Sequence, residues 1–516
     1  MKLNYKRTIL IGFAFFLICA FWQAYDATIP VILTNKFGMS QTASGIIMAL
    51  DNILAVFLLP IFGALSDKCR SKKGKRTPFI TIGTTIAAVV LVALTFVDHA
   101  QLQNVSDISK IDDPAALSVI YDQQKDATLQ TPEGKEFQLG VLFENKEDFT
   151  KITSEITLTE GNKEINPLYT NYVVPARQAC AAAATAAQPV PLYLFIGLLL
   201  ALLIAMSIFR SPAVALMPDV TIKPLRSKAN AVINLMGTAG GILVLVLGIV
   251  FATSAVKNAM MNYYVYYGII AALMLGSLLI FLRTVREPQW AQEMQEESTR
   301  LAIEEAEEEG EKRRLSKGEI RSMLLILASV ALWYIGYNAV TSKYSLYASS
   351  VLGMDYNTTM LIAQGAAIVA YLPAGMVASK IGRRKTILGG VVMLSAAFAI
   401  ASFMRAGSPV LLMNVLFALA GIGWATINVN SFPMAVEMCS GADIGKYTGY
   451  YYTASMAAQV ITPIFSGFLM DQMGMVVLFP YAAIFAGLAF VTMFFVKHGD
   501  NKVVAKKGLE ALDIED

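Results

Sequence analysis

The segment Gly63–Lys68 (GALSDK), followed by Gly74–Arg76 (GKR), decides the fold because a second version of it occurs later in the chain. Gly375–Lys380 (GMVASK) matches the first part and Gly382–Lys385 (GRRK) the second, at an offset of 312 residues (375 minus 63). The chain is therefore built twice. Duplicated halves, each with a short basic loop after its second membrane helix, are typical of secondary transporters whose binding site lies between the halves.

The composition places this chain among membrane proteins. Hydrophobic residues make up 56% of it, charged residues only 15%, and the mean hydropathy is +0.55, which is too apolar for a soluble domain. Twelve apolar runs are long enough to cross about 30 Å of hydrocarbon. They lie near Thr8–Leu33, Gln41–Leu65, Phe79–Val97, Pro191–Met217, Ala229–Ala252, Met260–Leu282, Ile320–Ala348, Thr358–Ala378, Thr386–Met404, Pro409–Pro433, Tyr447–Met470 and Met475–Val496. The first starts near Met1 and carries Asp26, so we expect a retained helix and not a cleaved signal peptide.

The predicted fold is an all-α membrane protein with twelve transmembrane helices in two pseudo-symmetric six-helix bundles and a small extracytoplasmic insert of partly β character. The expected parts are helices 1–3 (1–97), the insert (98–189), helices 4–6 (190–285), a charged cytoplasmic linker (286–318), helices 7–12 (319–497) and a cytoplasmic tail (498–516). Lysine and arginine gather before the first run and after the second, fourth, eighth and last. Both termini are therefore expected on the cytoplasmic face of a plasma membrane.

The two soluble pieces leave alternatives open. Alternating residues predict strands at Gly140–Phe143 and Lys151–Thr159, with a turn at Gly161–Asn162. The insert is then a decoration without a transport role, or a lid or docking surface. The Glu-rich linker is a solvated helix or a regulatory surface. Cys180 is the only cysteine of the insert, so we expect no disulfide framework.

Enzyme chemistry finds no support in the sequence. The two histidines, His99 and His498, lie at membrane edges and outside any cluster with metal-ligand spacing. The nearest approach to a phosphate-binding loop, Gly441–Tyr447, has one residue too few between its glycines and lacks a hydroxyl residue of the Ser/Thr type after Lys446. We therefore expect no enzyme activity, no cofactor and no resident metal. The net charge of +3 indicates no nucleic-acid partner, and an ion or solute gradient would drive transport.

Two carboxylates inside predicted spans are the sharpest functional signal, because an ionisable group in a membrane is costly. Asp26 and Asp51 both fall about 25 Å from the cytoplasmic ends of their helices at 1.5 Å per residue. The repeat pairs them with Asn338 and Ala363, so both charges belong to the first half alone. This asymmetric pair, with Arg210 nearby, predicts a coupling site for a proton or a sodium ion. The alternative is a pair of buried acids that only stabilises the fold.

Aromatic and amide side chains at similar depth predict a site for a sugar-like solute. Aromatic rings stack on the apolar face of a sugar ring, while amides and carboxylates bind its hydroxyls. The candidate substrate-binding residues are Trp22, Tyr25, Asp26, Asn52, Asn234, Tyr334, Tyr337, Asn338, Gln364, Trp424, Asn428, Tyr452 and Gln459. An aromatic stripe alone is also explained by helix packing.

At the Gly63 segment and at Pro218–Asp219, the chain resembles the major facilitator superfamily, over all twelve spans but not the insert or the linker. Within it, the chain looks most similar to the glycoside, pentoside and hexuronide cation symporters and the sucrose proton symporters. Sucrose symporters share an arginine at the position that Val214 occupies here, and Arg210 lies one turn away. The resemblance therefore does not imply sucrose itself.

The resemblance also implies a cytoplasmic gate. Gly63 would permit close packing of the second helix, Asp67 would lie near the start of the eleventh, and Lys75 or Arg76 would pair with Asp219 in the outward-open state. The further gate residues are Arg226 and, in the second half, Arg383, Arg384 and Glu437. Ser379 replaces the counterpart of Asp67, which argues against a symmetric second latch.

The sequence thus predicts a cation-coupled importer of a glycoside or disaccharide that rocks two six-helix bundles about a central site. Its partners would be a small-molecule sugar and the lipid bilayer, with a monomer as the default assembly. A polyspecific exporter of amphipathic compounds would use the same fold. A sugar sensor that does not transport would instead be expected to carry a large cytoplasmic signalling domain.

Overall fold

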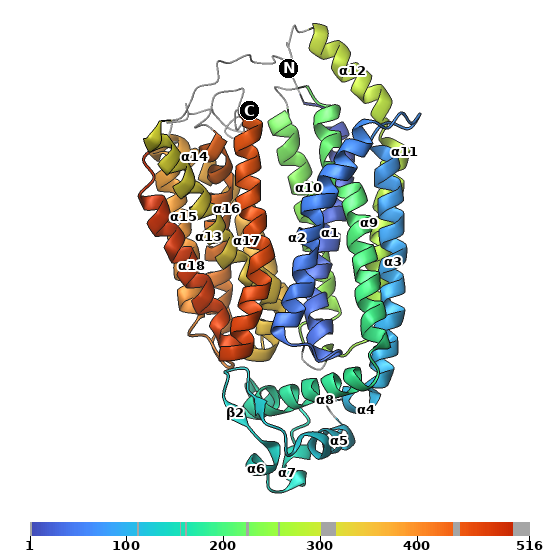
Figure 1. The fold of residues 1–516 in the computed structure, drawn as a ribbon, viewed down its shortest axis with the longest axis vertical. Helices are drawn as coiled ribbons and strands as arrows, with labels where there is room; N and C mark the ends of the chain where they lie inside the picture. Colours follow the sequence, from blue (N-terminus) through green and yellow to red (C-terminus); the bar gives the residue numbers. More distant parts are fainter. Residues whose placement is uncertain are drawn as a thin grey trace.

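The computed structural model describes residues 3–110, 113–154, 156–159, 162–222, 226–255, 258–300, 316–436 and 444–498. Two groups of long helices stand side by side, and the insert lies beyond one end of them (Figure 1). We call that end the insert side. The opposite end, where both termini lie, is the terminal side (Figure 1).

Twelve long helices within the described residues confirm the predicted spans to within four residues at each end, except that α3 ends seven residues later than predicted. The first half contains α1 (Tyr5–Asn35), α2 (Gln41–Asp67), α3 (Thr77–Asn104), α9 (Val190–Asp219), α10 (Arg226–Val250) and α11 (Tyr264–Thr284). The second half contains α13 (Lys317–Tyr347), α14 (Tyr356–Ile381), α15 (Arg383–Ala401), α16 (Val410–Val436), α17 (Ile444–Met473) and α18 (Leu478–Phe494). Eleven of them are long and apolar enough to span a membrane over their described residues, and α14 completes the arrangement.

Local sequence explains where several helices begin. The Ser40 side chain accepts a hydrogen bond from the Ala43 amide at the start of α2, and Ser316 with Glu319 forms a capping box at the start of α13. Asp355 caps α14, after Gly353 has turned the chain with a φ of 59°. These signals are local, so the helix boundaries follow the sequence closely.

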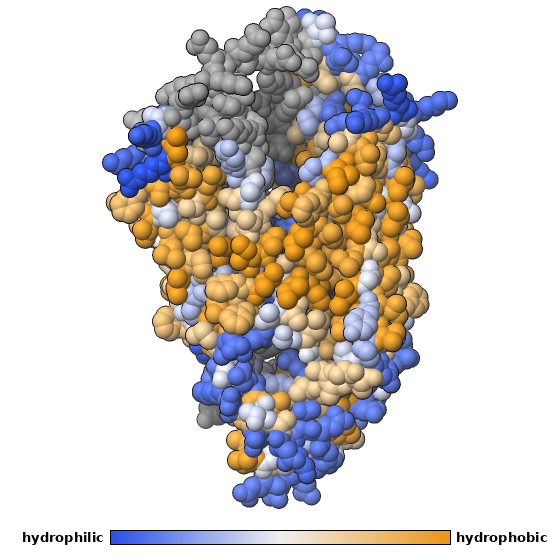
Figure 2. Space-filling view, in the orientation of Figure 1, coloured by the Kyte–Doolittle hydropathy of each residue, from blue (hydrophilic) through white to orange (hydrophobic). Residues whose placement is uncertain are grey.

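The surface of the helical body is apolar. Large hydrophobic side chains such as Phe57 (65% exposed) and Leu411 (76% exposed) point outward, and together they form a broad hydrophobic band between two polar ends (Figure 2). Each half encloses its own hydrophobic core. This arrangement fits a bundle whose outer solvent is lipid and whose halves are separate packing units.

The insert has a small core of its own and some β structure, as the sequence predicts. It contains α4 (Ser106–Ser109), α5 (Pro114–Gln124), β1 (Leu129–Gln130), β2 (Glu136–Phe137), α6 (Leu139–Leu142), α7 (Lys146–Thr150), β3 (Ile156–Thr159), β4 (Asn162–Ile165), η1 (Tyr169–Val173) and α8 (Val174–Ala187). β1 pairs with β2 and β3 with β4, both antiparallel, with Leu129 opposite Phe137 and Ile156 opposite Ile165. Burial raises the pKa of the Cys180 thiol in α8 to about 11, so this cysteine is an unreactive core residue.

Two predictions about the insert need correction. The predicted strand at Gly140–Phe143 is wrong, because α6 occupies it and the Gly140 amide donates to the Lys125 carbonyl (2.9 Å) where a strand would need a ladder partner. The boundary at residue 98 is also too early, since α3 continues to Asn104. Asp98 belongs to that helix, where its carboxylate forms a buried ion pair with Lys36 (2.6 Å).

The insert rests on both halves. On the first half, Gln178 of α8 donates to the Asn35 side chain (3.1 Å), and Gln101 donates to Thr185 (2.9 Å). On the second half, the Met475 amide donates to the carbonyl of Pro132, in the turn between β1 and β2 (2.8 Å). The insert therefore bridges the halves on its own side of the membrane.

Direct contacts between the halves also gather on the insert side. Ser254, after α10, donates to the carboxylate of Asp355 at the start of α14 (2.5 Å), and the hydroxyls of Thr253 and Tyr356 are hydrogen-bonded (2.8 Å). Burial opposes ionisation of Asp355, but hydrogen bonds from Ser254, Thr358 and Asn357 outweigh it and lower the pKa of this carboxyl. α2 and α17 lie close together near the insert and farther apart toward the terminal side (Figure 1).

Candidate functional site

A polar cavity of about 190 Å³ lies between the two halves. Its walls come from α1, α2 and α9 of the first half and from α13 and α17 of the second. The lining residues are Trp22, Asp26, Met48, Asp51, Asn52, Arg210, Asn338, Thr341, Ser342, Gln459 and Pro463. Apart from Met48, Pro463 and the Trp22 ring, every lining side chain is polar or charged. A cavity of this kind binds a polar solute by hydrogen bonds.

The cavity contains both carboxylates that the sequence singles out. Asp26 on α1 and Asp51 on α2 line it together with Arg210 on α9. The Asn52 amide donates to the Asp51 carboxylate (2.7 Å), and the Arg210 guanidinium lies over the Trp22 ring, 5.4 Å from its centre. Two acids and one guanidinium leave one negative charge when all three are ionised. A bound proton or cation would neutralise it, since an unbalanced charge in a buried site is costly.

The structure brings five of the thirteen candidate substrate-binding residues to this cavity. Those that line it are Trp22, Asp26, Asn52, Asn338 and Gln459. Those that lie elsewhere are Tyr25, Asn234, Tyr334, Tyr337, Gln364, Trp424, Asn428 and Tyr452. Helical periodicity alone does not separate these two groups, because it does not say which neighbour covers each face.

Three of the predicted aromatic residues pack on one another inside the second half. The rings of Tyr337 and Trp424 are stacked with their centres 3.7 Å apart, and Tyr334 meets Trp424 edge-on at 5.2 Å. Tyr452 is 50% exposed and packs against Phe432. At these positions the structure shows ring contacts between helices, which is the helix packing that the sequence left open as the alternative to a sugar site.

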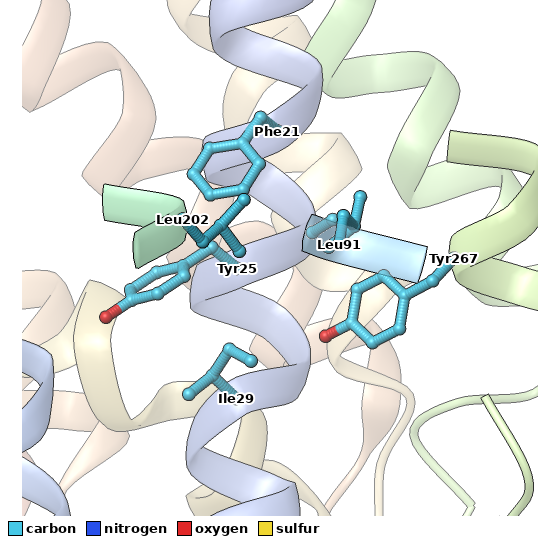
Figure 3. A pocket seen from close by; sticks show the side chains of 7 residues that line it. Phe21, Tyr25, Ile29, Leu91, Leu202 and Tyr267 are labelled. Carbon is cyan, nitrogen blue, oxygen red and sulfur yellow. The ribbon is translucent and has the colours of Figure 1, made fainter. Parts of the chain in front are cut away.

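Tyr25 is not among the residues that line the central cavity, although its ring packs edge-on against Trp22, which does line it (ring centres 5.4 Å apart). It lines a separate apolar void in the first half together with Phe21 and Ile29 of the same helix, with Tyr267 on the other side (Figure 3). This void has no room for a water molecule, and the Tyr25 hydroxyl has no hydrogen-bond partner among the described residues. In this conformation Tyr25 thus packs among apolar side chains of the first half, and its contact with a solute stays a prediction.

An amide pair, of which the sequence singled out only Gln364, connects the halves. Gln364 on α14 donates to the side-chain oxygen of Gln23 on α1 (2.6 Å). Gln23 was detectable as a polar residue three positions before Asp26 on an otherwise apolar helix. Thr341 and Ser342 complete the polar wall on α13. Lys343, the next residue, is fully buried inside the predicted seventh span, and the sequence analysis did not single it out.

The predicted gate residues form a compact network in the first half. Arg76, only 7% exposed, forms ion pairs with Asp67 (2.5 Å) and Asp219 (2.7 Å) and also donates to Ser66. Lys75 is exposed, so of the two predicted partners of Asp219 the structure shows Arg76. All members lie in one half. To close the terminal side, this network would need a partner from the second half, such as the start of α17, whose side chains lie outside the described residues.

A glutamate of the linker completes this network. Glu287, the first residue of α12 (Glu287–Arg300), is 3% exposed and accepts hydrogen bonds from the amides of Arg76 (2.8 Å) and Thr77 (2.8 Å) at the start of α3. Arg7 binds Glu293 of the same helix (2.6 Å). The linker helix is thus held against the first half. The Glu-rich run after Arg300 lies outside the described residues.

The second-half gate candidates are only partly described. Arg383 is buried, and the Arg384 guanidinium donates to the Phe494 carbonyl and lies 5.8 Å from the centre of the Phe494 ring. The side chain of Arg226 and all of Glu437 lie outside the described residues.

Comparison with known proteins decides the family. The sequence model of the Major Facilitator Superfamily matches residues 11–106, 178–372 and 358–514, which is most of the chain and leaves out residues 107–177, the larger part of the insert. The chain belongs to this superfamily. Members of this superfamily are generally transporters and not enzymes, and the eleven candidate spans among the described residues fit a multi-pass membrane protein.

Individual relatives are distant. The MFS-type transporter ppzB of Metarhizium majus is 28% identical over 120 residues, which cover 23% of this chain and 26% of that protein, and ppzB of Metarhizium rileyi is 27% identical over 120 residues, 23% of this chain and 24% of that protein. The matched region thus spans about a quarter of each relative.

Solved structures agree over nearly the whole length. The D-xylose-proton symporter has a TM-score of 0.56 at 16% identity and covers 96% of this chain and 99% of its own. The inward open xylose transporter XylE from E. coli has a TM-score of 0.54 at 16% identity, with 99% of both chains covered. A peptide transporter in complex with sulfate scores 0.55 at 9% identity, with 95% and 92% covered. At these identities the likeness shows the fold alone.

The gate network leads to a first prediction. Asp67→Asn or Asp219→Asn should shift the protein toward the state open on the terminal side, because each removes a carboxylate from Arg76. Solute affinity should stay within about tenfold, about 1.4 kcal/mol, since neither residue lines the cavity. Labelling of a cysteine introduced at Ser342, from each side of the membrane, measures the shift. Lys75→Met is the matched control and should change nothing, and an unaltered labelling ratio in both aspartate variants would refute the gate.

A second prediction concerns the insert. Replacing residues 105–188 by a flexible linker should leave the solute Kd within about threefold, about 0.7 kcal/mol, because no lining residue of the cavity belongs to the insert. The linker can join α3 to α9, since these two helices pack against each other. Equilibrium binding to the purified variant tests this. Loss of binding by a variant that still elutes as a folded protein would make the insert a lid.

Proposed function

We propose that this transporter imports a sugar together with a cation, proton or sodium, and that both bind in the central cavity. The observation that carries the proposal is the lining itself: amides, hydroxyls, two carboxylates and one guanidinium surround a space between the halves, with the Trp22 ring at one wall. Sugars offer many hydroxyls and one apolar ring face, and this lining complements both. The resemblance to the glycoside, pentoside and hexuronide symporters supports the same solute class.

Cavity size supports a small solute. Its 190 Å³ lies below the roughly 300 Å³ at which ordinary ligand pockets begin. A single sugar ring therefore suits the site in this conformation, and a disaccharide would need the halves to separate further. A polyspecific exporter of amphipathic compounds would be expected to have a larger and more apolar cavity.

The charges in the cavity support coupling to a cation. Binding of one cation cancels the excess negative charge of Asp26, Asp51 and Arg210, so the loaded site becomes neutral before the halves rearrange. We place the termini in the cytoplasm of a plasma membrane, because the basic loops lie on that side. The insert side is then extracytoplasmic, and the present conformation is the one in which the extracytoplasmic contacts are closed.

A binding and uptake screen tests the proposal. Purified protein is titrated with monosaccharides and disaccharides, with and without sodium and at two pH values, and the same solutes are offered to proteoliposomes that carry an inward proton or sodium gradient. We expect saturable sugar binding that depends on one of the two ions and uptake that the same ion drives. Binding without uptake would favour a sensor, and gradient-driven expulsion would favour an exporter.

A further inference from the structure

The first turn of α2 is capped by a residue from the other half of the molecule. The Asp471 carboxylate, near the end of α17, accepts hydrogen bonds from the backbone amides of Gln41 (2.8 Å) and Thr42 (2.8 Å), and from the Thr42 hydroxyl. The Ser40 hydroxyl accepts a hydrogen bond from the next amide, that of Ala43 (3.2 Å). An anion at a helix N-terminus satisfies otherwise unpaired amides and interacts favourably with the helix dipole. Two of the three satisfied amides therefore depend on Asp471.

A buried lysine completes this contact. Lys343 on α13 is 0% exposed, and its ammonium group donates to the Gln41 carbonyl (2.9 Å). Gln41 thus bonds Lys343 through its carbonyl and Asp471 through its amide. Lys343 and Asp471 therefore bind two neighbouring peptide groups that meet at Gln41, so the two side chains stabilise the same contact. Both residues belong to the second half, and both hold the first residue of α2.

The backbones of α2 and α17 approach closely at the same place. A Cβ added to Gly467 would lie 2.7 Å from the carbonyl carbon of Gln41, and one added to Gly45 would lie 2.7 Å from the carbonyl carbon of Pro463. Pro463 also lines the central cavity. Eight residues separate it from Asp471, which is about 12 Å along a helix. The Asp471 contact therefore lies directly between the cavity and the insert side.

We propose that Asp471 and Lys343 form a latch with the start of α2 that keeps the cavity closed to the insert side. When α17 withdraws from α2, the two amides exchange the carboxylate for water and the cavity opens toward the insert. The latch stabilises one of the two alternating conformations whatever the solute is, so it does not depend on the proposed sugar specificity. Its counterpart is the Arg76 network at the other end of α2.

Cysteine accessibility from each side of the membrane tests the latch. The four native cysteines are replaced by serine, and Ser342→Cys places one thiol in the cavity wall on the far side of the latch. A separate Val141→Cys protein, labelled at a position that is 75% exposed on the insert, identifies which side of a vesicle is the insert side. A membrane-impermeant maleimide is then applied from either side, in intact cells and in inverted vesicles.

Asp471→Ala should raise the labelling rate of the thiol introduced at Ser342 about tenfold from the insert side, equivalent to about 1.4 kcal/mol, and lower it from the terminal side. Lys343→Met should act in the same direction, and the double variant should add little to either single change, because both act on Gln41. Asp471→Asn keeps one acceptor oxygen and should change the labelling rates in the same direction by a smaller factor. This variant replaces Asp471→Ala in the test if the alanine variant does not fold. Asp148→Ala, an exposed carboxylate of the insert, is the matched control.

Two outcomes overturn the latch. An unchanged insert-side rate in folded Asp471→Ala and Asp471→Asn proteins would show that the carboxylate does not hold the conformation. An equal rise from both sides would show that it only maintains the fold of α17. A reciprocal change, up on the insert side and down on the terminal side, is the result that the latch requires.

Discussion

Asp51→Asn is expected to abolish accumulation of the solute against its gradient while exchange of solute across the membrane continues. Asp51 lines the cavity on α2, whose first turn is bound by Asp471 and whose last residue, Asp67, is bound by Arg76. A charge change at Asp51 therefore acts on a helix that is bound by other residues at both of its ends. Asparagine keeps the size and hydrogen-bonding capacity of the side chain but removes the charge that attracts a cation.

Proteoliposomes measure this directly. Uptake driven by a proton or sodium gradient should fall to the level reached without a gradient, while counterflow of labelled solute should persist at a rate within about tenfold of the parent protein, about 1.4 kcal/mol in activation free energy. Concentrative uptake by Asp51→Asn with an unchanged ion dependence would remove Asp51 from the coupling site.

Asp26→Asn is expected to weaken solute binding about 10- to 100-fold, which corresponds to about 1.4 to 2.8 kcal/mol and to the loss of a hydrogen bond to a charged group. Asp26 lies one helical turn from Trp22 on α1, and both line the cavity. The ring and the carboxylate are thus placed to contact the apolar face and the hydroxyls of one sugar. Equilibrium binding at saturating ion concentration measures the change.

The two variants are matched controls for each other. Each removes one carboxylate from the same cavity and leaves its volume nearly unchanged, so a general electrostatic effect would alter both in the same way. Distinct outcomes, lost coupling for Asp51→Asn and lost affinity for Asp26→Asn, would separate the two roles. If Asp26→Asn left the solute affinity unchanged, the sugar contacts would have to be assigned to the amides Asn52, Asn338 and Gln459.

The sequence by itself determined the architecture, because the signals for it are local or additive. A span is recognised by the summed hydropathy of about 20 residues, and the repeat of Gly63–Lys68 at Gly375–Lys380 divides the chain into halves without reference to any contact. Ser40 and Ser316 mark the starts of α2 and α13 by capping, which involves only neighbouring residues. The depth of Asp26 and Asp51 also follows from counting along a helix.

Only the tertiary structure decided which side chains face the cavity and which bind the two ends of α2. Tyr337 and Asn338 are neighbours on α13, and both are predicted substrate-binding residues. In the structure Tyr337 stacks on Trp424, whereas Asn338 lines the cavity. Arg76 pairs with Asp219 and Gln41 with Asp471, and both partners are far away along the sequence. A sequence pattern gives the period of a helix but not the rotation at which its neighbours meet it. That rotation results from the packing of all twelve helices together, and it determines which polar residues line the cavity.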